Sequence, residues 1–189
     1  PPSLAARTLP DIPSGRGQPV TLDTAAETTL WIVEQGGCQG IFHAINEEDL
    51  RRIPVHPPTM VGSDGEIPIF GRNHPHPRSY GTFARVLGVY AREKKLLTLE
   101  TAVQKMSAFP AQRLGLADRG VIREGLKADI AVFDPATVRD TATFEKPHSY
   151  AEGVGYVLVN GQVVFENGRM TDARPGRVLY GPARKPQPA

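Results

Sequence analysis

The sequence predicts an α/β segment followed by an all-β segment, with the change near residues 115–120. Before that point, apolar residues recur at helical spacing, and short apolar runs separate the predicted helices. After Gly120 the apolar period falls to two, which is typical of half-buried strands. Asn160-Gly161 then stands between two apolar runs, and Asn-Gly is the strongest two-residue signal for a β-hairpin.

The α/β segment is predicted to begin with a loop, because the prolines of residues 1–19 oppose a stable helix. Capping residues, apolar spacing and Gly or Pro stops then define the expected elements. In order, these are a helix over 21–35, a strand over 38–45, a helix over 47–53 that Pro54 ends, a strand over 59–63, and helices over 78–92, from Thr98, and from Pro110 to Gly115. The order strand, short helix, strand is typical of a parallel sheet.

The all-β segment is predicted to contain a strand over 128–134, a hairpin of strands over 154–159 and 162–165, and a final strand over 177–180. A second Asn-Gly at 167–168 predicts another tight turn. The proline-rich residues 181–189 are predicted to be a disordered tail.

Composition excludes several classes of partner. The 189 residues carry a net charge of +2 with no long run of either sign, so no nucleic-acid partner is expected. No apolar run approaches the roughly 20 residues of a membrane helix, so no membrane partner is expected. Cys38 is the only cysteine, which predicts a small buried residue and a reducing, cytoplasmic location. The chain begins without methionine, which suggests a piece of a longer protein.

Asp64 is the first candidate functional residue. It lies in the run Thr59-Met60-Val61-Gly62-Ser63-Asp64-Gly65-Glu66, where a short, buried apolar segment leads one carboxylate into a glycine turn. At the carboxyl end of a strand in an α/β barrel, such an acid can bind a metal or move a proton. Because Asp-Gly is also ordinary turn chemistry, a purely structural turn is the alternative.

Arg78 is the second candidate. It follows Asp64 after a long loop rich in proline and glycine, and it starts a predicted amphipathic helix. Arginine can hold a carboxylate through two parallel hydrogen bonds. A solvated arginine at a helix start is the alternative. A cation at a helix start opposes the helix dipole, and this small cost is a weak indication of function.

Histidines give a weaker indication of a metal site. His74 and His76 mimic a His-x-His ligand pair, but they alternate with prolines in a loop, where no strand fixes their directions. A catalytic zinc usually has three protein ligands, and this chain offers one strand-end acid. Either the protein is no metalloenzyme, or the other ligands belong to residues that are absent here.

At these residues the chain resembles the D-aminoacylase family, the N-acyl-D-amino-acid deacylases of the amidohydrolase superfamily. Two motifs are specific to that family, namely the run from Thr59 to Gly65 and His76-Pro77-Arg78. The resemblance covers nearly the whole chain, and its other motifs are Asn46-Glu47-Glu48-Asp49-Leu50-Arg51, Phe109-Pro110-Ala111-Gln112-Arg113-Leu114-Gly115-Leu116, Arg119-Gly120-Val121-Ile122-Arg123-Glu124-Gly125, Lys127-Ala128-Asp129-Ile130 and Val159-Asn160-Gly161.

The fold that the resemblance implies consists of the last strands and helices of a metal-dependent (β/α)8 barrel, a TIM barrel, followed by part of a small β-sandwich domain. Residues 1–115 would be the carboxyl-terminal part of the barrel, 116–180 the β-sandwich portion and 181–189 the disordered tail. Family members tend to have a helix where Leu9 to Ser14 stands, and two prolines argue against one here.

The function that the resemblance implies is zinc-dependent removal of the N-acyl group from N-acyl-D-amino acids. Asp64 would be the catalytic base and then acid, and also a metal ligand, while Arg78 would bind the substrate's α-carboxylate. Most zinc ligands of the family match nothing here, so the chain would need the missing amino-terminal barrel portion and would be inactive alone. The alternatives are another amidohydrolase, of the dihydropyrimidinase or dihydroorotase kind, and a non-catalytic remnant that acts as a structural or interaction module.

Overall fold

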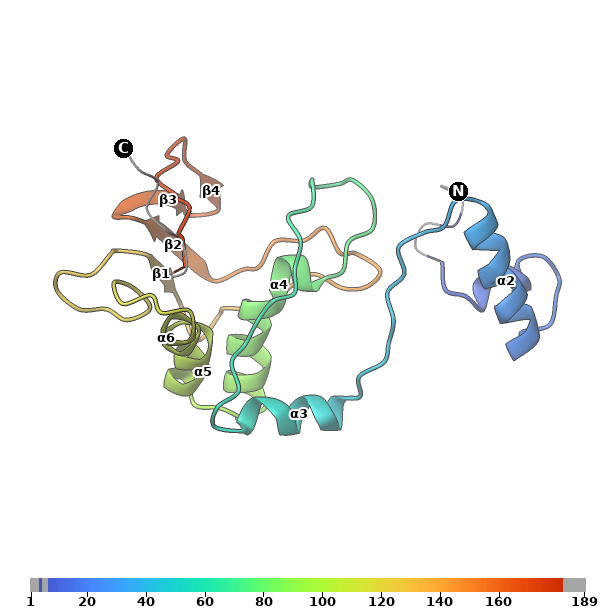
Figure 1. Cartoon of the computed structure of the whole chain (residues 1–189), viewed down its shortest axis with the longest axis horizontal. Helices are drawn as coiled ribbons and strands as arrows, with labels where there is room; N and C mark the ends of the chain where they lie inside the picture. The colour runs from blue at the N-terminus through green and yellow to red at the C-terminus, as the bar shows by residue number, and fades with distance from the viewer. Residues whose placement is uncertain (1–3, 5–6, 182–189) are drawn as a thin grey trace.

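Helices occupy the first part of the chain and an antiparallel sheet follows them (Figure 1). The computed structural model describes residue 4 and residues 7–181. Its elements are α1 (Asp11–Ser14), α2 (Leu22–Glu34), α3 (Glu47–Val55), α4 (Arg78–Arg85), the π-helix η2 (Val86–Glu93), α5 (Leu99–Met106), α6 (Ala108–Arg113), β1 (Ile130–Phe133), β2 (Val154–Val159), β3 (Gln162–Glu166) and β4 (Arg169–Met170). Of the predicted disordered tail, residues 182–189 lie outside the described residues.

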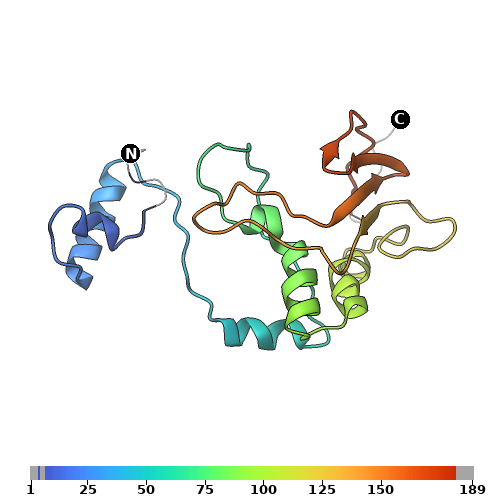
Figure 2. The same ribbon diagram turned by 180° about the vertical axis from the view of Figure 1, so that it is seen from behind.

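The first two helices pack on each other and lie apart from the rest of the chain, joined to it by an extended run (Figures 1 and 2). Helix α1 overturns the prediction of a helix-free start. Pro10 stands at its N-cap and Pro13 in its first turn, where backbone N–H groups have no partner within the helix, so neither ring breaks a hydrogen bond. Helix α2 confirms the prediction for 21–35, and Thr21 caps it together with Thr24.

Three predicted strands are absent from the described part of the chain: 38–45, 59–63 and 177–180. A strand exists only beside a hydrogen-bonded neighbour, and none of these segments joins a ladder among the described residues. Residues 59–63 instead run beside α5, where the Val61 N–H donates to the Lys105 carbonyl at 3.0 Å. The parallel sheet expected from the strand–helix–strand order is therefore not formed within the described residues.

The other predicted helices are confirmed with small shifts at their ends. Asn46 caps α3, which continues past Pro54 to Val55, because a proline this close to a helix end removes little hydrogen bonding. Arg78 is the first residue of α4, and the predicted helix over 78–92 continues through η2 to Glu93. Thr98 caps α5. Helix α6 begins before Pro110, which falls in its first turn.

Helices α4 and η2 pack closely against the segment around Val138, a buried residue of the hydrophobic core. Gly81 and Gly88 make this approach possible, because an added Cβ would lie 2.7 Å from Asp140 Cβ and 2.7 Å from the Val138 carbonyl oxygen, respectively. Arg92 donates to the same Val138 oxygen at 2.7 Å. The buried core residues are Ala84, Val86, Leu87, Tyr90, Ala91, Leu97, Ala102 and Val138.

The sheet has the strand order β1-β2-β3-β4, and all its pairs are antiparallel. The predicted hairpin is confirmed, since Asn160 and Gly161 join β2 to β3 with φ of 47° and 80°. The second Asn-Gly turn, at 167–168, joins β3 to β4. The strand predicted over 128–134 is shorter and spans β1, so the predicted change of segment falls between α6 and β1.

One prediction that rested on a single residue is wrong. Cys38, predicted to be buried, is exposed and lies in the stretch between α2 and α3 that forms neither helix nor strand. Among the described residues, none of the helices has the length and apolar character needed to cross a bilayer.

Candidate active site

Asp64 and Arg78 form an ion pair across the long loop. The Arg78 Nη2 atom lies 2.8 Å from Asp64 Oδ2. The Nε–H of the same guanidinium donates to the backbone oxygen of Asp64 at 2.7 Å. The Asp64 side chain is 84% exposed and the Arg78 side chain 43%, so both groups can reach a small molecule from solvent.

The turn that carries Asp64 rests on the first turn of α4. Asp64 has φ of 48°, in the left-handed region that aspartate tolerates better than most residues. Gly65 allows the close approach, since an added Cβ would lie 3.0 Å from Ser79 Cα. The Ser79 hydroxyl accepts from the Glu66 N–H at 3.2 Å. The turn is thus fastened to the helix that presents Arg78.

The expected burial of the segment before Asp64 is only partly found. Val61 packs against the core, whereas Met60 is exposed. One packed side chain is enough to hold this segment in place, because the Val61 N–H also donates to a carbonyl of α5 and no sheet neighbour is needed. Both proposed site residues are nevertheless brought together by the structure.

His76 and His74 are engaged by the loop itself. The His76 Nδ1 atom accepts from the Arg78 N–H at 3.0 Å, and the His74 Nε2 atom lies 2.6 Å from the Phe144 oxygen. Burial lowers the pKa of His76, and the nearby cation of Arg78 lowers it further, while the Asp64 carboxylate opposes the shift. The two imidazoles therefore bond to two different partners and do not converge on one position, as two ligands of one metal ion would.

No metal site is complete among residue 4 and residues 7–181, where no group of three or more His, Cys, Asp and Glu side chains could hold an ion. Asp64 is the one carboxylate of the candidate site, and its neighbour is a cation. The described residues therefore do not by themselves fit the zinc that the resemblance implies, because a zinc site needs more anionic or imidazole ligands than this.

A contact that sequence patterns missed holds the long loop in place. His148 lies at hydrogen-bonding distance from Gly71, Asn73 and Tyr80. The Phe70 ring packs against His148, and it stacks on Tyr150 with 5.0 Å between ring centroids. His148 stands beside a proline in a loop and belongs to no recognisable motif, so only the three-dimensional contact reveals it.

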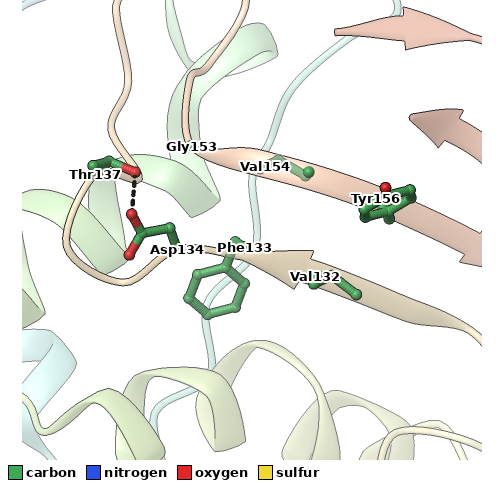
Figure 3. A pocket seen from close by; sticks show the side chains of 8 residues that line it. Val132, Phe133, Asp134, Thr137, Gly153, Val154 and Tyr156 are labelled. Carbon is green, nitrogen blue, oxygen red and sulfur yellow. Dashed lines mark hydrogen bonds between the residues drawn. The ribbon is translucent and has the colours of Figure 1, made fainter. Parts of the chain in front are cut away.

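A hollow near the start of β2 carries no comparable chemistry (Figure 3). Asp134 is its acid, but that carboxylate accepts from the Ala136 N–H at 2.9 Å and from the Thr137 hydroxyl at 2.8 Å. These bonds lower its pKa and fix a turn. Apolar side chains and glycines make up most of the remaining wall.

The comparison with known proteins identifies the family of the chain. The sequence profile of the amidohydrolase family matches residues 16–165. The chain belongs to the amidohydrolase family. This amidohydrolase chain is 46% identical to the D-aminoacylase of Alcaligenes xylosoxydans xylosoxydans over 178 residues, which cover 94% of the chain and 34% of that relative.

Two further similar proteins are both N-acyl-D-glutamate deacylases. The N-acyl-D-glutamate deacylase of Alcaligenes xylosoxydans xylosoxydans is 51% identical over 139 residues, covering 74% of this chain and 28% of the relative. The crystal structure of the N-acyl-D-glutamate deacylase from Bordetella bronchiseptica, complexed with zinc and a phosphonate inhibitor, superposes with a TM-score of 0.77 and 41% identity over 92% of this chain and 34% of its own. The amidohydrolase chain thus spans about a third of the length of such relatives.

Proposed function

We propose that this chain is the carboxyl-terminal portion of an enzyme that removes the N-acyl group from N-acyl-D-amino acids. The observation that supports the proposal is the Asp64–Arg78 ion pair, in which Asp64 would be the proton acceptor and Arg78 the cation that binds a substrate carboxylate. The similarity to deacylases along 94% of the chain supports it, because the whole pair lies within the matched region. Residues 1–115 would complete a (β/α)8 barrel and residues 116–180 a β-sandwich.

Asp64 would move the proton in this reaction. Hydrolysis of an amide requires that the attacking water lose a proton and that the leaving amine gain one. An exposed carboxylate can accept the first and return it to the amine nitrogen, so one residue serves as base and then as acid. The ion pair with Arg78, at 2.8 Å, would orient this carboxylate.

Arg78 would orient the substrate. One of its Nη atoms and its Nε atom are used on Asp64, and the remaining N–H groups of the guanidinium are left for an anion. The α-carboxylate of an N-acyl amino acid is such an anion, and a charge-assisted bond to arginine fixes both its position and its plane. The scissile amide would then lie beside Asp64.

Zinc remains part of this proposal, with Asp64 as one ligand and most other ligands from residues that this chain lacks. The same reasoning makes the missing amino-terminal barrel portion the protein partner.

The decisive experiment compares the full-length protein with the 189-residue chain. We expect full-length protein, purified with zinc, to release free D-amino acid from N-acetyl-D-glutamate or N-acetyl-D-leucine and to leave the L-enantiomers largely intact. The 189-residue chain with added zinc should release none. Hydrolysis of dihydroorotate in place of the N-acyl-D-amino acids would overturn the assignment, and turnover by the short chain at ordinary rates would overturn its inactivity.

A further inference from the structure

We propose that His148 is a positioning residue that fastens the loop between Asp64 and Arg78 and thereby sets the direction of Arg78. The inference rests on the proposed function in one respect, namely that Arg78 binds the substrate carboxylate. His148 lies 77 residues from Gly71 and 68 from Tyr80 in sequence, yet contacts both. It joins the loop, the first turn of α4 and the segment before β2.

The hydrogen bonds define where the imidazole proton lies. The Gly71 N–H can only donate, and it lies 3.1 Å from His148 Nδ1, so this nitrogen carries no proton. The proton is therefore on Nε2, which donates to the Asn73 carbonyl oxygen at 3.0 Å. The Tyr80 hydroxyl, 2.9 Å from Nδ1, is then also a donor and shares the single lone pair of that nitrogen with the Gly71 N–H. Burial raises the pKa of the Tyr80 phenol, which helps to keep that proton in place.

The two backbone contacts hold the two ends of one tight turn. Gly71 and Asn73 both have positive φ, of 77° and 60°. Within the turn, one backbone hydrogen bond runs from the Arg72 N–H to the Ile69 oxygen. The Gly71 N–H and the Asn73 carbonyl oxygen therefore need partners outside the turn to hold its conformation. His148 adds a second pair of bonds at the same turn, so the loop acquires a single arrangement.

Tyr80 links this turn to Arg78. It lies two residues after Arg78 in the first turn of α4, and its ring packs edge-on against both Phe70 and Tyr150. A loop released from His148 would also release the Tyr80 hydroxyl. The start of α4 would then lose a fixed contact, and the guanidinium of Arg78 its fixed direction.

The central test uses the full-length enzyme and the variants His148→Leu and His148→Gln. Glutamine carries one acceptor and one donor at a spacing close to that of the two ring nitrogens, whereas leucine carries neither. We expect His148→Leu to raise KM for an N-acyl-D-amino acid about tenfold with kcat changed less than threefold, and His148→Gln to restore most of the loss. A fall in kcat alone, or no rescue by glutamine, would overturn the proposal.

A double-mutant cycle separates positioning of Arg78 from a general structural role. In an Arg78→Ala background, His148→Leu should change kcat/KM less than about twofold, because the group through which it acts is gone. An equal loss in both backgrounds would show that His148 does not act through Arg78. As a matched pair, Tyr80→Phe should raise KM, and Tyr150→Phe should not, since the Tyr150 hydroxyl makes no hydrogen bond to His148 within the described residues.

A measurement without turnover keeps this inference separate from the proposed function. Nitrogen-15 NMR of the full-length protein should show His148 protonated on Nε2, and amide exchange over 65–80 should rise in His148→Leu but not over β2 and β3. A proton on Nδ1, or unchanged exchange in the loop, would overturn the positioning role. If these results hold while no N-acyl-D-amino acid is hydrolysed, only the proposed function fails.

Discussion

The Arg78 guanidinium contacts Asp64 at two points. It lies 2.8 Å from the Asp64 carboxylate and donates to the Asp64 backbone oxygen at 2.7 Å. A single guanidinium therefore fixes both the direction of the carboxylate and the turn that carries it. The two candidate groups behave as one unit, so a change in either side chain alters the surroundings of the other. Single variants must then be chosen to change one property at a time.

Asp64→Asn should abolish turnover in the full-length enzyme while the fold is kept. Asparagine has nearly the same shape and also tolerates the positive φ of 48° found here, but it cannot accept and return a proton. We expect kcat to fall by at least about a hundredfold, measured as release of free D-amino acid. Near-normal kcat would mean that Asp64 serves only as a turn residue.

Asp64→Ala is the matched control for the backbone. Alanine removes the carboxylate and has a higher conformational free energy than asparagine at the positive φ found here. It should therefore lower the midpoint of thermal unfolding more than asparagine does. If both variants unfold at the same temperature and lose activity equally, strain at this position plays no part in the loss.

Lys105 should contribute to stability through its ammonium group. Its side chain is buried, and Nζ donates to the backbone oxygens of His56, Pro57 and Thr59 at 2.7, 3.0 and 3.0 Å. Lys105→Met keeps most of the apolar stem and removes the ammonium donor from all three oxygens, of which the His56 oxygen still accepts from the Thr59 N–H at 3.1 Å. We expect the free energy of unfolding to fall by about 1–3 kcal/mol, measured by urea denaturation of the full-length protein.

The control for that measurement is Lys146→Met, because Lys146 is exposed and its ammonium has no hydrogen bond within the described residues. It should change the free energy of unfolding by less than about 0.5 kcal/mol. Equal effects of the two substitutions would show that the contacts of Lys105 with the carbonyl groups add nothing.

His76 should make stability depend on pH below neutrality. Its pKa in the folded state is lowered, chiefly by burial and then by Arg78 and His43, so the unfolded chain binds a proton more readily. The stabilisation from neutral His76 is present above its unfolded pKa of about 6.5 and is lost as pH falls below that value toward the folded pKa. His76→Gln should flatten this fall between pH 7 and pH 5 in urea unfolding. Superimposable pH curves for the two proteins would contradict the shift.

Features set by nearby residues could be predicted from the sequence, and features set by distant partners could not. Helix α5 was predictable because Thr98 caps it locally, and the hairpin because Asn160-Gly161 selects its turn. The strand expected over 38–45 was wrong because a strand depends on a neighbour that no local pattern supplies. The motifs marked Asp64 and Arg78 individually, but their direct contact, like the contact between His148 and Gly71, follows from the folded loop.

Arg78→Lys should harm activity almost as much as Arg78→Ala. Lysine keeps the charge but loses the planar fork, so it cannot hold Asp64 and a substrate carboxylate at the same time. Losing the charge-assisted bonds to substrate should cost roughly 1.5–3 kcal/mol, about one to two decades in kcat/KM. Both variants are to be measured in the full-length enzyme on an N-acyl-D-amino acid and on the analogue whose α-carboxylate is a neutral amide.

The comparison of these two substrates decides what Arg78 holds. On the amide the loss should shrink sharply, because the guanidinium then has no anion to bind. The part of the loss that persists on the amide measures the support that Arg78 gives to Asp64, since that contact is the same for both substrates. Equal losses on acid and amide would mean that Arg78 only supports the turn at Asp64 and the start of α4, and that the substrate carboxylate is bound elsewhere.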